Sequence, residues 1–194
     1  SNLQFNLNRK QTRVRLFEIG CCFVREGESD CKQVERIAGL SYGDVVSEQW
    51  GVPARNVDFY DVKADVEVLC RGRTIYFKKF LHPALHPGKS AQICIEDKSI
   101  GWLGELHPRW QKKYGLQKNT ILFEISLESL KSKSLSVAKE ILKFPPVRRD
   151  IAIIVESDIS VHSLLVCLFA EKSAIVSDIS LFDIYRGKGM ENTK

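Results

Sequence analysis

Three of the four histidines are the residues best suited to metal chemistry. His82 and His86 lie within the segment His82-Pro-Ala-Leu-His-Pro-Gly88, and His107 follows later in the chain. A spacing of four residues is typical of a ligand pair on one face of a helix. However, His82 and His86 each precede a proline, which disfavours helical backbone at the residue before it. We interpret the segment as a rigid turn with hydrogen-bonded histidines. The alternative is an independent metal-dependent enzyme that uses His82, His86 and His107.

A second candidate set is acidic and consists of Asp58, Asp61 and Asp65, which span about two turns of a predicted helix. Carboxylates are ligands that Mg²⁺ prefers, but acidic residues at helical spacing also form an ordinary solvated face. We favour the solvated face and predict no metal site. The sequence has no G-x-S-x-G elbow, no G-x-G-x-x-G and no Walker loop. We therefore predict no catalytic residue in this chain.

Positive residues at predicted loop tips form the third set. They lie in the phrases Phe144-Pro-Pro-Val-Arg-Arg-Asp150 and Leu181-Phe-Asp-Ile-Tyr-Arg-Gly-Lys-Gly189. Arginine and lysine can contact phosphates, and tyrosine can stack on a base. A solvated basic turn would have the same composition, and Asp150 could instead pair with Arg149 or Arg186. The candidates for nucleic-acid binding are Arg148, Arg149, Tyr185, Arg186 and Lys188.

The distribution of charge limits the nucleic-acid hypothesis. The net charge is +5, but residues 143–194 contain seven Lys/Arg and seven Asp/Glu. The basic surplus therefore lies in residues 1–142, and bulk electrostatics does not make the terminal segment an RNA binder. A free-standing RNA-binding module remains an alternative that depends on local placement of the arginines.

Composition favours an ordinary globular protein, with 44% apolar and 27% charged residues. No apolar run approaches the roughly 18 residues of a membrane span, and the first residues do not resemble a signal peptide. No cysteine pair has C-x-x-C spacing. We expect a cytoplasmic protein with reduced thiols, no membrane association, and an excised fragment, since no initiator methionine is present.

The elements that position these residues fall into two predicted domains, residues 1–140 and 141–194. In the first, residues 13–24 and 34–40 are predicted to form a hairpin. A helix capped by Asn56 or Asp58 should run to Gly72. Short strands are expected at 74–80, 90–95, 99–106 and 120–125, with a helix at 108–114 and one helical turn at 127–130. Gly101 and Gly104 indicate close packing or a bulge.

The second domain is predicted to open with an extended linker at residues 143–146, because adjacent prolines fit neither a helix interior nor a central strand. Residues 149–156 are rich in β-branched side chains and predict a strand. Ser160 should cap a helix that ends near residue 171, and residues 175–185 should return as a second strand.

Several phrases in this order resemble the beta subunits of bacterial phenylalanyl-tRNA synthetases. The two terminal phrases are similar to the start of their ferredoxin-like anticodon-binding domain. The upstream resemblance to their catalytic-like domain covers Arg15-Leu-Phe-Glu-Ile-Gly20, Asp58-Phe-Tyr-Asp-Val-Lys63, the histidine segment and residues 101–108.

The resemblance implies an α+β fold: an antiparallel class II synthetase-like sheet flanked by helices, followed by a ferredoxin-like β-α-β unit. It implies a tetramer of two alpha and two beta subunits that joins phenylalanine to tRNA(Phe) with ATP and Mg²⁺. The active site would lie in alpha, and this fragment would hold no cofactor. The catalytic-like domain would pack against alpha, and Arg148, Arg149, Tyr185, Arg186 and Lys188 would lie near the anticodon.

The same resemblance predicts that the second domain is incomplete. In a β-α-β-β-α-β fold the third strand lies between the first two, and only the first β-α-β is present. We expect the half-domain to be poorly ordered, to pair its two strands directly, or to be completed by a neighbouring molecule.

Overall fold

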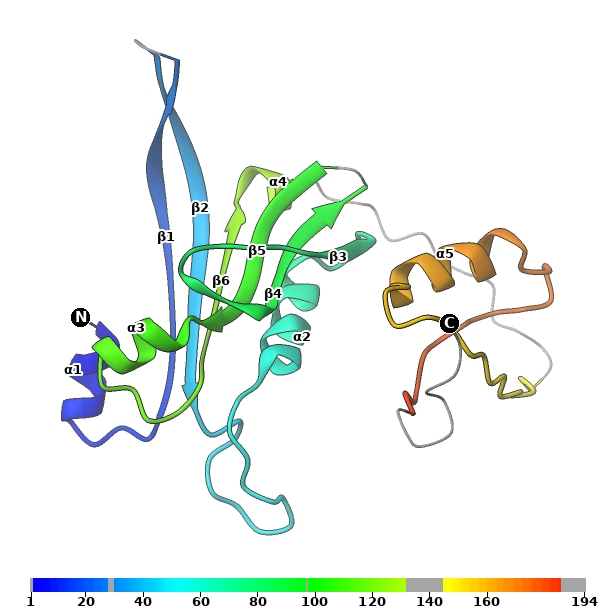
Figure 1. Cartoon of the computed structure of the whole chain (residues 1–194), viewed down its shortest axis with the longest axis horizontal. Helices are drawn as coiled ribbons and strands as arrows, with labels where there is room; N and C mark the ends of the chain where they lie inside the picture. Colours follow the sequence, from blue (N-terminus) through cyan, green and yellow to red (C-terminus); the bar gives the residue numbers. More distant parts are fainter. Residues whose placement is uncertain (1, 28–29, 97, 132–144, 186–194) are drawn as a thin grey trace. The chain divides into compact units, whose positions relative to one another are not determined.

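The computed structural model describes residues 2–27, 30–96, 98–131 and 145–185. The chain divides into two compact units, residues 1–137 and 138–194 (Figure 1). The first contains a six-stranded antiparallel sheet and short helices, which confirms the α+β class. The second is built around one helix in its described part.

The sheet of the first unit has the order β1-β2-β6-β5-β4-β3. The predicted hairpin is confirmed, and both of its strands are longer than predicted. Gly20 pairs with Arg36 and does not interrupt the ladder. Cys21 and Cys22 face Glu35 and Val34 respectively, so they point to opposite sides of the sheet, as expected. The strands are β1 (Arg13–Glu26), β2 (Asp30–Gly43), β3 (Ile75–Lys79), β4 (Leu85–Ile95), β5 (Lys98–Leu106) and β6 (Thr120–Ser126).

Strand β4 begins earlier than predicted and includes Pro87. Its pairing with β5 shifts register between Leu85 and Ser90, and β3 pairs only with the later part of β4. A proline is tolerated where the ladder is irregular and one side lacks a partner strand. Pro87 is therefore accommodated within an irregular strand, whereas Pro83 lies in the turn that precedes it.

The helices of this unit are α1 (Asn2–Asn8), α2 (Phe59–Leu69), α3 (Pro108–Lys113) and α4 (Glu128–Lys131). Asp58 caps α2 and Gly72 follows it with φ +87°, as predicted from capping and glycine signals. α3 and α4 are also confirmed within a residue or two. Helix α1 was not predicted, although its Leu3 and Leu7 have the spacing of one helix face.

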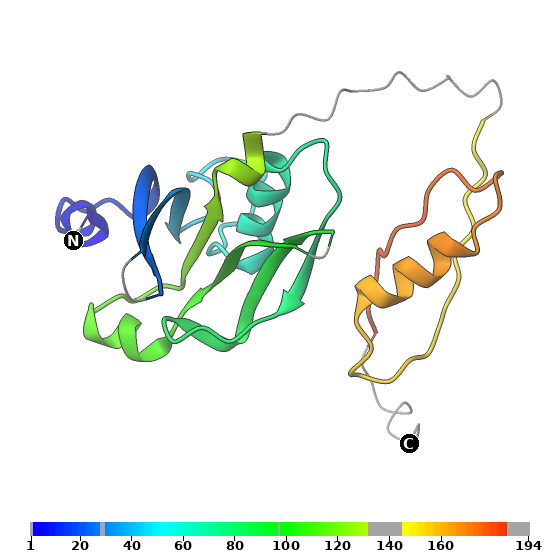
Figure 2. The same ribbon diagram turned by 90° about the horizontal axis from the view of Figure 1, so that it is seen from above.

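Two apolar clusters lie on opposite faces of the sheet. On one face α2 packs against the central strands β6 and β5, with Val66, Leu103 and Ile125 fully buried. Strand alternation places Val14 and Tyr42 on the other face, where α1 packs over β1 and β2. Both views place α1 and α3 at the same end of this unit (Figures 1 and 2).

In the second unit the predicted helix is confirmed as α5 (Val161–Ala170), with the Ser160 hydroxyl accepting from the Ser163 N–H at 3.1 Å. The two strands predicted at 149–156 and 175–185 are wrong for the described residues, which form no strand there. A strand needs a hydrogen-bonded neighbour, and in the predicted fold that neighbour is a third strand between them. Direct pairing of the two segments, one expected outcome, is likewise absent from residues 145–185.

Candidate nucleic-acid interface

Arg148 and Phe182 bring the two terminal phrases together within the second unit. The guanidinium carbon of Arg148 lies 5.0 Å from the centroid of the Phe182 ring. Its Nε donates to the Asp150 carboxylate at 3.0 Å, and the two side chains are 74% and 60% exposed. Solvent screens such a pair. A guanidinium stacked on a ring can still donate from its edge to a phosphate.

Arg149 and Tyr185 are also exposed in this unit. The Arg149 Nη1 donates to the Arg148 carbonyl at 3.3 Å, and Tyr185 is 69% exposed. Of the two alternatives considered for Asp150, pairing with Arg149 does not occur, because Asp150 pairs with Arg148; pairing with Arg186 falls outside the described residues. Arg186 and Lys188 lie outside the described residues.

Phe182 is the residue that sequence reasoning missed. It lies 34 positions from Arg148, so no local pattern connects the two. The only signal is an aromatic residue in a segment already singled out. The charge of Arg148 can bind a phosphate, and the exposed rings of Phe182 and Tyr185 can stack on an unstacked base.

The histidines are engaged locally. The Nδ1 atoms of His82, His86 and His107 accept backbone N–H groups, at 3.3, 3.0 and 3.1 Å. This confirms the predicted hydrogen-bonded histidines. His82 also stacks on Trp102, with ring centroids 5.0 Å apart. His82 and His107 line one pocket, and His86 does not. In the described part of the chain, no three His, Cys, Asp or Glu side chains are placed to hold a metal.

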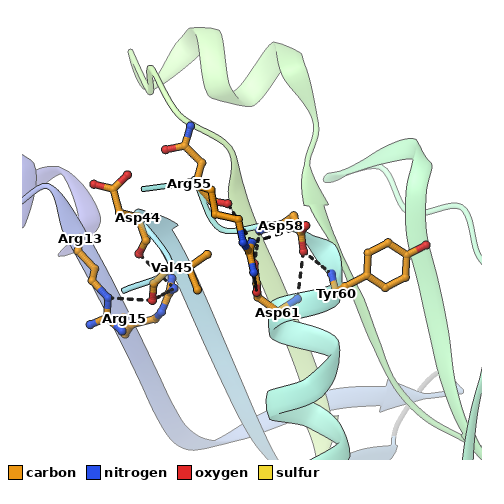
Figure 3. Close-up of polar contacts among 9 residues, drawn as sticks. Arg13, Arg15, Asp44, Val45, Arg55, Asp58, Tyr60 and Asp61 are labelled. Carbon is orange, nitrogen blue, oxygen red and sulfur yellow. Dashed lines mark hydrogen bonds and ion pairs between the residues drawn. The ribbon is translucent and has the colours of Figure 1, made fainter. Parts of the chain in front are cut away.

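Two of the three acidic candidates form a helix cap. The Asp58 carboxylate accepts from the N–H groups of Tyr60 and Asp61 at 2.8 and 3.1 Å, and Asp61 accepts from the Asp58 N–H at 2.9 Å. The Arg55 guanidinium donates two hydrogen bonds to the Asp61 carboxylate, of 2.7 and 2.6 Å (Figure 3). The solvated-face interpretation is therefore wrong for Asp61, whose side chain is only 18% exposed. Asp65 is exposed.

Asp61 makes the stability of this cap depend on pH. Hydrogen bonding from Arg55 lowers the pKa of Asp61 to about 2 from 3.8. A depressed folded-state pKa stabilises the fold above the ordinary value, and this contribution is lost as pH falls from about 4 towards 2. We expect Asp61→Asn to cost about 1 kcal/mol at neutral pH and to reduce the loss of stability between pH 5 and pH 2. Urea unfolding across that range measures both effects.

Asp65→Asn is the matched control, because Asp65 is on the same helix and outside the capping box. It should keep the acid dependence of the parent chain. An acid dependence of Asp61→Asn equal to that of the parent would contradict the role of Asp61.

Comparison with protein families accounts for both units. Residues 1–127 match the family described as phenylalanyl tRNA synthetase beta chain CLM domain. The chain belongs to this family. Residues 143–194 match the ferredoxin-fold anticodon binding domain, so the predicted second domain is present as a sequence family.

Individual beta-chain relatives match over the whole sequence. The phenylalanine–tRNA ligase beta subunit of Nitrosospira multiformis is 56% identical over 100% of this chain and 24% of its own length. That of Dechloromonas aromatica is 44% identical over 100% of this chain and 25% of its own. That of Neisseria gonorrhoeae is 46% identical over 97% and 24%. The chain thus spans about a quarter of the length of these beta subunits.

Two further features of this beta-chain family member are the lengths of its helices and the state of its cysteines. Among the residues that the structure describes, no helix has the length and apolarity needed to cross a membrane. All six cysteines are free thiols, and Cys70 and Cys94 are buried. Burial raises the pKa of the Cys70 thiol, which lowers its reactivity.

Proposed function

We propose that this chain is a non-catalytic part of the beta subunit of phenylalanine–tRNA ligase. It supports the alpha subunit through residues 1–140 and takes part in binding the anticodon region of tRNA(Phe) through residues 141–194. The observation that carries the proposal is the pair of family matches, which follow one another along the chain in the expected order.

The rest of the enzyme supplies the chemistry in this proposal. Two alpha and two beta subunits form a cytoplasmic tetramer, and the alpha subunits use ATP and Mg²⁺ to attach phenylalanine. The local engagement of the histidines and of Asp58 and Asp61 supports this division, because those side chains already serve turns and a helix cap. The same engagement disfavours an independent metal-dependent enzyme.

Coexpression with the alpha subunit tests the proposal. The full-length beta subunit that contains this chain should copurify with alpha and attach phenylalanine to tRNA(Phe). A beta subunit that folds, fails to bind alpha and leaves tRNA uncharged would exclude it. Stoichiometric zinc in the purified chain would instead favour the metal-dependent enzyme.

Arg149 and Arg186 are the residues with which to test the tRNA contact. Replacing either by alanine in the assembled enzyme should weaken tRNA(Phe) binding by roughly 1–3 kcal/mol, because a contact to phosphate or base is lost. Fluorescence titration of tRNA measures this. The same experiment extends to Arg148, Tyr185 and Lys188.

Lys172→Ala is the control for these variants, since it removes an exposed cation from the same unit just beyond α5. Its tRNA affinity should equal that of the parent enzyme. Parent-like affinity in both arginine variants would remove them from the interface.

A further inference from the structure

Two stretches of the first unit are basic and contain no acidic residue. Residues 1–17 and 106–119 together hold eight Lys/Arg and no Asp or Glu. The net charge of the entire chain is +5, so these two stretches contain more than its whole basic surplus. They lie almost ninety residues apart in the sequence, and only the fold can combine their charges.

The fold does combine them. Leu3 and Leu7 of α1 pack in one cluster with Val14, Tyr42 and Leu116, the last of which lies just after α3. Figures 1 and 2 both show α1 and α3 at the same end of the sheet, on the β1–β2 side. The two acid-free stretches therefore contribute to one basic end of the unit.

Three cations of these stretches are held by oxygen atoms of Asp44 or Val45. The guanidinium groups of Arg13 and Arg15 donate to the Val45 carbonyl at 3.2 and 3.4 Å (Figure 3), and Lys118 pairs with Asp44 at 2.8 Å. The remaining five are exposed. We call them the α1–α3 basic surface: Arg9, Lys10, Arg109, Lys112 and Lys113.

The five cations differ in their surroundings from several other cations of this unit. Arg36, Arg55 and Lys89 each lie within 2.7 Å of a carboxylate oxygen. Within the described residues, none of the five cations of the α1–α3 basic surface is within ion-pair distance of a carboxylate. A merely solvated helix face commonly mixes both signs of charge. This surface presents one sign only and so attracts anions.

Aromatic rings alternate with the cations on α3. Arg109 and Lys113 lie 4.7 and 5.0 Å from the centroid of the Trp110 ring. Trp110 stacks on Tyr114 at 6.4 Å and 25°; Trp110 is half-buried and Tyr114 is 50% exposed. An anionic peptide or lipid needs only the charges. Exposed rings among cations are what single-stranded nucleic acid requires, because its bases stack while its phosphates pair.

α1 repeats this pairing on its own surface. The Arg9 guanidinium carbon lies 3.4 Å from the centroid of the Phe5 ring, which is 56% exposed. The same two kinds of side chain thus occur on both helices that the leucine cluster brings together.

We propose that the α1–α3 basic surface binds the phosphate backbone of RNA, with Trp110 and Tyr114 available to an unstacked base. This site is in the catalytic-like unit and is built from different residues than the anticodon candidates of the second unit. That the RNA is tRNA(Phe) rests on the proposed function; that the ligand is RNA rests on the charges and rings.

The test uses the assembled enzyme with the triple change Arg109→Gln, Lys112→Gln and Lys113→Gln. Affinity for tRNA(Phe) is measured by fluorescence titration over a series of KCl concentrations. Each phosphate contact contributes about one unit to the slope of log K against log salt. We expect the slope to fall by about 2–3 units and the affinity at low salt to fall about tenfold or more. A parent-like slope in the folded variant overturns the proposal.

Lys78→Gln, Lys79→Gln and Lys98→Gln together form the matched control. They remove the same charge from exposed positions near the other edge of the sheet, at β3 and the start of β5. This control should keep the parent slope; an equal loss would show a general charge effect and overturn the site. The charge-retaining variant Arg109→Lys, Lys112→Arg and Lys113→Arg should bind as the parent does, and thermal unfolding should be unchanged in all three.

The outcomes separate this inference from the proposed function. If Arg149→Ala weakens tRNA binding and the triple change does not, the function stands and the α1–α3 site is rejected. If the parent enzyme does not bind tRNA(Phe), the proposed function fails. Binding of poly(A) then tests the α1–α3 site. The site is supported if the triple change lowers salt-dependent poly(A) binding and the lysine control does not, and it is rejected otherwise.

Discussion

Gly101→Ala is expected to destabilise the first unit by about 3 kcal/mol, near the upper end for an overpacked position. A Cβ at residue 101 would overlap the carbonyl oxygen of Glu124 and lie 2.9 Å from the Cα of Ile125. Both neighbours are backbone of β6, the strand that pairs with β5, so no side chain can rotate away. Either β5 separates from β6 or the centre of the sheet shifts.

Urea unfolding of the 194-residue chain, followed by circular dichroism, measures this effect. Gly20→Ala is the matched control, because a Cβ there meets nothing within 4 Å and Gly20 is also in a strand. It should be neutral or slightly stabilising, since alanine loses less backbone freedom on folding. Equal stability of the two variants would contradict the close packing of β5 on β6.

Leu103→Ala should cost about 2–5 kcal/mol, the range for deleting a buried leucine side chain. Leu103 is 0% exposed and lies in the middle of β5, between Ala91 and Phe123 on the neighbouring strands. Its face of the sheet carries the cluster against which α2 packs. The cavity would therefore lie between helix and sheet, where rigid strands limit collapse.

The measurement is again the free energy of unfolding in urea, with Ile19→Ala as control. Ile19 is an apolar residue of β1 that is 55% exposed, so its truncation should change stability by about 0.5 kcal/mol or less. A loss below 1 kcal/mol for Leu103→Ala would show that the cluster is not the main source of stability in this unit.

Local signals account for what could be predicted about the fold. The cap at Asp58 and the alternation of side chains along β1 and β2 each depend on residues that are close in the sequence. Both could therefore be predicted from the sequence. The turns at the histidines could also be predicted, because each imidazole accepts a hydrogen bond from the N–H group only two residues further along the chain. The glycine spacing around residue 101 also predicted close packing correctly.

The strands predicted in the second unit show where local signals fail. Residues 149–156 have strongly β-branched composition, but composition cannot supply a hydrogen-bonded neighbour. A helix makes its backbone hydrogen bonds within itself, so α5 forms where predicted. A strand depends on another segment, so its formation is decided outside its own residues.

The sequence by itself determined the family, the α+β class, the local caps and turns, and the candidates Arg148, Arg149 and Tyr185. Only the tertiary structure decided which distant residues meet. It placed Arg148 on Phe182 and joined the acid-free stretches of α1 and α3 into one basic surface. The physical reason is range: capping and periodicity act over one or two turns of chain, whereas charge and ring stacking act through space between segments that only packing brings together.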